Sequence, residues 1–143
     1  MAEHTTKFAP RTGGCYCGAL RYAVSGRPLV KGQCHCRPCQ QFAGGGPQYF
    51  ELVAPDSFDW THGTPASFAL DDLENAVTRF FCATCGTQVL TRRQDQAALV
   101  LKVGTLDDPA RFRPHVAICH GDAQAFHMVP DNIPVFDGLP PRG

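Results

Sequence analysis

The sequence lacks an excess of charge of either sign, and it lacks long apolar runs. Thirteen Lys and Arg residues balance thirteen Asp and Glu residues, so the basic surface on which duplex-binding proteins depend is missing. No stretch approaches the roughly 18 apolar residues that a membrane helix needs, and the first thirty residues hold no apolar core of a signal peptide. These absences predict a cytoplasmic protein with neither a nucleic-acid partner nor a membrane partner.

The length of 143 residues favours a single domain over residues 1–143, because a chain of this size can bury roughly two thirds of its unfolded surface. The ends, residues 1–10 and 139–143, carry few apolar side chains. We therefore expect both ends to be loosely held.

Glycine and proline separate short segments rich in β-branched and aromatic residues, a texture typical of an all-β domain of short antiparallel strands. One or two helical turns are expected over residues 37–43. A second short turn is expected over residues 107–111, where Asp107 or Asp108 can cap and Pro109 fits the first position. The expected strands cover residues 19–24, 48–53, 58–61, 67–70, 76–81, 87–91, 98–103 and 115–119.

Seven of the eight cysteines fall into three groups along the chain, namely Cys15 and Cys17, then Cys34, Cys36 and Cys39, then Cys82 and Cys85. In a reducing compartment such spacing indicates metal binding rather than disulfides. The last pair, followed by Gly86, predicts a zinc knuckle, because two cysteines three apart around a tight turn point both sulfurs at one ion. Zinc takes four tetrahedral ligands, so seven thiolates at two ions leave one position open.

The local group of Cys34, Cys36 and Cys39, called the triplet below, is too compact to be divided between two ions, so it most simply holds three corners of one site. The two pairs then close a structural site, which supplies about 10 kcal/mol or more of binding free energy to the folded state. Its ligands are Cys15, Cys17, Cys82 and Cys85. The triplet site keeps an exchangeable fourth position, as catalytic zinc sites do.

Other interpretations of the cysteines remain open. The Cys-x-x-Cys pair can be a redox dithiol, and thiolate ligands alone do not separate zinc from an iron–sulfur cluster. A second site that is purely structural requires Cys119 or a histidine at its fourth corner. Strand parity makes Cys119 a buried, inert thiol by default, whereas His35 is expected to turn away from the metal, either supporting the site or exposed.

Three motifs surround the cysteine groups: Gly-Gly-Cys-Tyr-Cys-Gly at 13–18, Cys-His-Cys-Arg-Pro-Cys at 34–39 and Phe-Phe-Cys-Ala-Thr-Cys-Gly-Thr at 80–87. With the closing segment Pro-Asp-Asn-Ile-Pro-Val-Phe-Asp-Gly at 130–138, they resemble the glutathione-dependent formaldehyde-activating enzyme family, which also includes the centromere-protein-V-like proteins. The resemblance covers nearly the whole chain.

The resemblance implies a β-tent type zinc domain with two Zn²⁺ per chain. One zinc would be structural, on the first pair and the knuckle, and the other would be catalytic or labile, on the triplet. The family also implies carbon–sulfur lyase chemistry, the reversible formation of S-(hydroxymethyl)glutathione from glutathione and formaldehyde. The expected partners are thus a small thiol and a small aldehyde.

The residues themselves suggest how such a reaction would proceed. At an open triplet zinc a substrate thiol binds as a thiolate, which is the nucleophile that attacks an aldehyde, so Cys34, Cys36 and Cys39 form the predicted catalytic centre. The carboxylates of glutathione require a cation; Arg37 is nearest in sequence, and the other candidates are Lys31, Arg92 and Arg93. The alternative function is a non-catalytic two-zinc module that binds a partner or handles thiols or metal.

Overall fold

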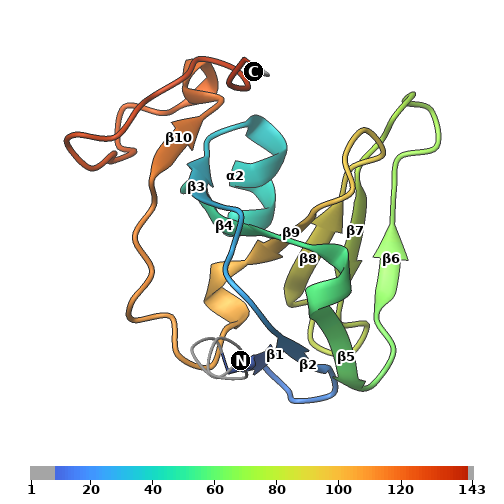
Figure 1. Cartoon of the computed structure of the whole chain (residues 1–143). Helices are drawn as coiled ribbons and strands as arrows, with labels where there is room; N and C mark the ends of the chain where they lie inside the picture. The colour runs from blue at the N-terminus through green and yellow to red at the C-terminus, as the bar shows by residue number, and fades with distance from the viewer. Residues whose placement is uncertain (1–8, 142–143) are drawn as a thin grey trace.

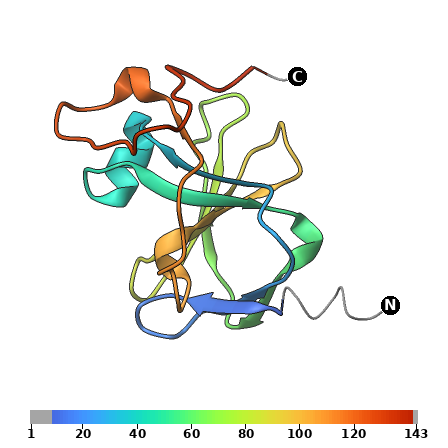
Figure 2. The same ribbon diagram turned by 60° about the vertical axis from the view of Figure 1, so that its left-hand side comes forward.

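The structure is a computed structural model that describes residues 9–141, and short strands dominate it (Figures 1 and 2). The mostly β fold with few helices is confirmed. Of the tails predicted at 1–10 and 139–143, residues 1–8 and 142–143 lie outside the described residues. Between residues 9 and 141, no helix has the length and apolar character needed to cross a bilayer.

The strands form two sheets (Figure 1). The smaller sheet is antiparallel and orders its strands as β1 (Arg11–Gly14), β2 (Arg21–Val24) and β5 (Phe58–His62). The larger sheet orders seven strands as β10 (Val116–Ile118), β3 (Val30–Cys34), β4 (Gln48–Val53), β9 (Leu99–Lys102), β8 (Gln88–Arg92), β7 (Thr78–Phe81) and β6 (Ala66–Phe68). Its pairs are antiparallel except for β10 with β3, which run parallel, so the expectation of antiparallel strands holds with this one exception.

All eight expected strands are present, the one at 48–53 with the expected ends and the other seven with shifted ends. Two further strands, β1 and β3, were not expected. Both missed strands contain glycine, which depresses strand propensity. In β3 the glycine is required by close packing, because a Cβ at Gly32 would lie 2.8 Å from the Phe50 ring and 3.0 Å from Val116. The turn expected at 107–111 is a single turn, in which Phe112 donates to the Pro109 carbonyl and the Asp108 carboxylate accepts from Ala110.

The helix expected at 37–43 is present as α2 (Arg37–Ala43), with the expected ends. Its first turn is capped by Cys36, whose Sγ accepts a hydrogen bond from the Cys39 N–H at 3.3 Å, and Pro38 suits the first turn because it needs no N–H partner there. Gly44, at φ 87°, ends the helix in the left-handed conformation. Two members of the triplet therefore define the start of α2.

The core lies where the two sheets face each other, and residues from both contribute to it. Tyr22 of the smaller sheet is wholly buried, with its ring 5.0 Å from that of Phe58. The Tyr22 hydroxyl lies 2.7 Å from the hydroxyl of Thr105. Thr105 lies in the short 3₁₀ turn Val103–Thr105, directly after β9 of the larger sheet. The residues that strands of the larger sheet contribute to this core cluster are Val53, Val89, Leu90 and Leu101.

Replacing Gly13 by alanine should lower the free energy of unfolding by about 1–3 kcal/mol, because the added Cβ would collide with the Thr105 carbonyl oxygen and the buried Tyr22 hydroxyl. Gly104→Ala is the matched control, since a Cβ there meets no atom within 4 Å, and it should change stability by less than about 0.5 kcal/mol. Urea unfolding of metal-saturated protein measures both values. Equal effects of the two variants on stability would contradict the conclusion that close packing against Thr105 and Tyr22 requires glycine at position 13.

Candidate metal centres

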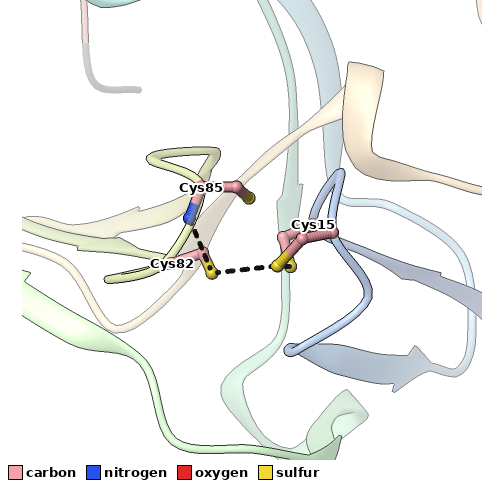
Figure 3. A group of neighbouring side chains, drawn as sticks. Cys15, Cys82 and Cys85 are labelled. Carbon is pink, nitrogen blue, oxygen red and sulfur yellow. Dashed lines mark hydrogen bonds between the residues drawn. The ribbon is translucent and has the colours of Figure 1, made fainter.

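Four cysteines from distant parts of the chain bring their sulfurs together. Cys15 and Cys17 lie in the turn after β1, and Cys82 and Cys85 lie in the turn between β7 and β8. Figure 3 shows Cys15 facing Cys82 and Cys85 across these two turns. The Sγ atoms of Cys15 and Cys17 are 3.7 Å apart, as are those of Cys17 and Cys82, and all four lie within 4.8 Å of one another. A tetrahedral zinc with bonds of about 2.3 Å separates its sulfurs by about 3.8 Å, so this donor set fits zinc.

Backbone N–H groups point at these sulfurs. Leu20 donates to Cys15 Sγ at 3.2 Å and Cys85 donates to Cys82 Sγ at 3.5 Å. The Thr87 hydroxyl, 3.2 Å from Cys85 Sγ, and the Thr87 backbone lower the pKa of Cys85 to about 5. Such donors stabilise the thiolate form that a metal ion requires.

The triplet is the second sulfur group. Cys34 ends β3, Cys36 caps α2 and Cys39 lies in its first turn, and the three Sγ atoms lie within 4.8 Å of one another. No other histidine, cysteine or acidic residue between residues 9 and 141 joins this group. Cys36 and Cys39 are 2.8 Å apart at sulfur, so they must separate by about 1 Å to share a tetrahedral ion.

The residues near the triplet include two cations that sequence reasoning missed. Lys102 on β9 is buried, and its Nζ donates to the Thr91 hydroxyl at 3.3 Å. Burial lowers the pKa of Lys102 to about 8, an effect that the Cys39 thiol opposes and that Arg79 reinforces. Arg79 on β7 places its guanidinium 4.2 Å from the ring centre of Phe42 on α2. The sequence feature that could have pointed to Lys102 is a lysine at the end of the otherwise apolar strand Leu99–Lys102.

The cations nominated from the sequence lie elsewhere or have other partners. Arg37 is exposed at the start of α2, where it donates to Gln40. Arg93 pairs with Asp95 at 2.6 Å. Arg92 lies 5.3 Å from the ring of Phe80, and Lys31 lines a separate cavity with Arg11 and Glu51.

His35 is wholly buried and is not a member of the triplet group. Its Nδ1 lies 2.9 Å from Nδ1 of His127, and its Nε2 lies 3.0 Å from the Gln33 amide nitrogen. Burial, with His127 and His120 nearby, lowers the pKa of His35 to about 4, so the ring is neutral at pH 7. His35 therefore ties the C-terminal segment, which lies beside α2 in Figure 2, to the strand that carries Cys34.

Cys119 is half-buried rather than buried as expected. It follows β10, whose Ile118 lies opposite Cys34 in the parallel register, and hydrogen bonding to Cys34 lowers the pKa of Cys119. Cys119 thus contacts one member of the triplet without joining the group of three.

Comparison with known proteins places these features in a family context. A family model described as glutathione-dependent formaldehyde-activating enzyme matches residues 10–122. A Halomonas elongata protein provisionally named as such an enzyme is 31% identical over 80 residues, covering 52% of this chain and 51% of that protein, so the match spans about half the length of the relative. A crystal structure of a Rhodobacter sphaeroides protein matches with a TM-score of 0.58 at 16% identity, over 87% of this chain and 98% of that one, which shows a shared fold.

Cys82→Ser should unfold the protein or destabilise it by about 5 kcal/mol or more, because this cluster joins residues 65 positions apart. Cys36→Ser should leave a folded protein, since the triplet closes only a short loop and a serine hydroxyl also caps a helix. Thermal unfolding of both variants, saturated with metal, measures the difference. Equal losses of thermal stability would contradict the division into a structural and a functional cluster.

Proposed function

Because this chain belongs to the glutathione-dependent formaldehyde-activating enzyme family, we propose that it is a zinc-dependent carbon–sulfur lyase that joins glutathione to formaldehyde. The observation that carries the proposal is the triplet, in which three thiols converge and no fourth cysteine or histidine of residues 9–141 joins them. Three protein ligands and one open position are typical of catalytic zinc.

The triplet supplies the metal ligands for this reaction. Cys34, Cys36 and Cys39 would hold the ion, and a bound zinc would keep an incoming thiol deprotonated near neutral pH. The thiol sulfur forms a bond to the aldehyde carbon, and the π electron pair of the carbonyl moves to its oxygen. This oxygen then takes up a proton, which balances the proton that the thiol released. Glutathione and formaldehyde thus give S-(hydroxymethyl)glutathione with no other reactant.

A cavity of about 330 Å³ beside α2 is our candidate for the body of the thiol substrate. Apolar side chains surround most of it, and Pro38, next to Cys39, forms part of its wall. Arg79 also lines it and can pair with a substrate carboxylate through two parallel hydrogen bonds. Arg37 adjoins Pro38 on the exposed side of the helix and remains a proposed second contact.

The contact between Cys119 and Cys34 supports a second candidate function, a non-catalytic two-zinc module. If Cys119 were the fourth ligand, the site would be closed and would bind a partner or handle metal without turning over a substrate. In either case the free thiols suit a reducing compartment, and we propose a cytoplasmic location.

Protein saturated with zinc should contain about two ions per chain, and a mild chelator should remove one of them first. In cobalt-substituted protein, glutathione should change the visible spectrum of the wild type and of Cys119→Ser, but not of Cys36→Ser. A cobalt spectrum that already indicates two four-ligand sites, with no response to glutathione, would instead favour the non-catalytic module. Iron with visible charge-transfer absorption would contradict both zinc proposals.

Arg79→Leu should raise KM for glutathione by roughly tenfold while changing kcat little, because a charge-assisted hydrogen bond is worth about 1.5–3 kcal/mol. Arg113→Leu is the matched control, since Arg113 is exposed and bonds only to neighbouring carbonyls among the contacts of residues 9–141. NMR exchange between free formaldehyde and its glutathione adduct, corrected for the unassisted rate, measures both. No acceleration by the wild type would contradict the lyase assignment. An unchanged KM for glutathione in Arg79→Leu would contradict the proposal that the cavity binds the thiol substrate.

A further inference from the structure

Lys102 is a buried cation without a carboxylate partner. Its side chain is 6% exposed, and the three ion pairs formed within residues 9–141 join other residues. The hydroxyl of Thr91, 3.3 Å from Nζ, is a neutral partner. Lysine is almost never fully buried unless it is paired, because desolvation disfavours the ammonium ion. Negative charge from another source would therefore stabilise the ammonium form of Lys102 in this position.

The sheet register places Lys102 on the face that carries the triplet. Lys102 lies opposite Phe50, and Phe50 lies opposite Gly32 on β3. Two residues further along β3 is Cys34, which shares a face with Gly32 because side chains alternate along a strand. The thiols of the triplet act on Lys102 electrostatically in the direction that favours its ammonium form.

The charges of the site show what Lys102 contributes. Three thiolates and a divalent ion sum to one negative charge, and an incoming thiolate raises this to two. A neutral ligand at the same position leaves the sum unchanged. In a partly buried site, a positive charge on the same face of the sheet stabilises the added negative charge by much more than it would in water.

We propose that Lys102 is the positive counter-charge of the triplet, a positioning residue that raises the affinity of the site for thiolates over neutral ligands. The proposal rests on the proposed function, since it takes the triplet to be a metal site with an open position. It deepens that function by naming the class of ligand that the site selects, an anionic sulfur donor. If Lys102 only stabilised the fold, its replacement would weaken the binding of thiolates and of neutral ligands equally.

The test is a comparison of two ligands on cobalt-substituted protein, followed by visible spectroscopy. Lys102→Met should keep two metal ions per chain and should weaken glutathione binding by about tenfold or more, whereas its affinity for imidazole, a neutral ligand, should stay within about twofold of the wild type. Lys102→Arg, which keeps the charge, should restore glutathione binding. Lys31→Met is the matched control, because Lys31 and Cys34 project from opposite faces of β3 and Lys31 lines the cavity with Arg11 and Glu51.

Equal losses for glutathione and imidazole, or no loss for either, would overturn the proposal. Methionine is similar in length to lysine and removes the cost of a buried charge, so Lys102→Met is expected to fold. If it does not, the wild-type protein still provides the test. The chain has three lysines, Lys7, Lys31 and Lys102, so the Nζ resonance of Lys102 can be identified with the Lys7→Met and Lys31→Met variants. It should shift when glutathione binds and should stay in place with imidazole, and the reverse would overturn the proposal.

These outcomes separate the two proposals. If the wild type binds glutathione in a Lys102-dependent way but does not accelerate adduct formation, the lyase assignment fails and the role of Lys102 stands. If the wild type is an active lyase and Lys102→Met binds glutathione as tightly as the wild type does, only the role of Lys102 fails.

Discussion

The meeting of four sulfurs between the β1–β2 turn and the β7–β8 turn is the constraint on which the rest of the structure depends. A three-stranded sheet and a sheet of short strands each bury little apolar surface alone. A metal ion bound by both Cys17 and Cys82, whose sulfurs lie 3.7 Å apart, would hold the two sheets together and offset the entropy cost of closing the long loop between these residues. The wholly buried Tyr22, with its hydroxyl against Thr105, is well placed only once the sheets have met.

The triplet depends on more local interactions. Cys36 both caps α2 and offers a ligand atom, so the start of the helix and the shape of the site form together. Cys34 is held from the other side, because β10 pairs with β3 and the buried His35 bonds to His127. The segment that follows β10 thus supports the site without offering a fourth member to the cysteine group.

The features that could be predicted from the sequence are those set by local spacing. The division of seven cysteines into four and three, and the limits of α2, follow from ligand geometry and capping within a few residues. Strand β3 was missed because Gly32 is dictated by Phe50 and Val116, which lie far away in the sequence. Arg79 and Lys102 were missed for a related reason, since only the register of the strands from β3 to β7 places them on the face of the triplet. Nearness in sequence instead pointed to Arg37, which is exposed.

Both sulfur groups accept backbone N–H donors, in the triplet from Cys39 to Cys36 Sγ, but in our proposal only the triplet also has a buried full charge on its face of the sheet. Backbone N–H groups of Leu20 and Cys85 point at the four-cysteine group, and such fixed dipoles suit a set of ligands that never changes. In the proposed reaction, the charge at the triplet changes each time a thiolate enters or leaves. A buried ammonium such as Lys102, which bonds to the neutral hydroxyl of Thr91, would favour the more negative state without occupying the proposed open position. A full charge at a distance therefore suits an exchanging site, as close dipoles suit a permanent one.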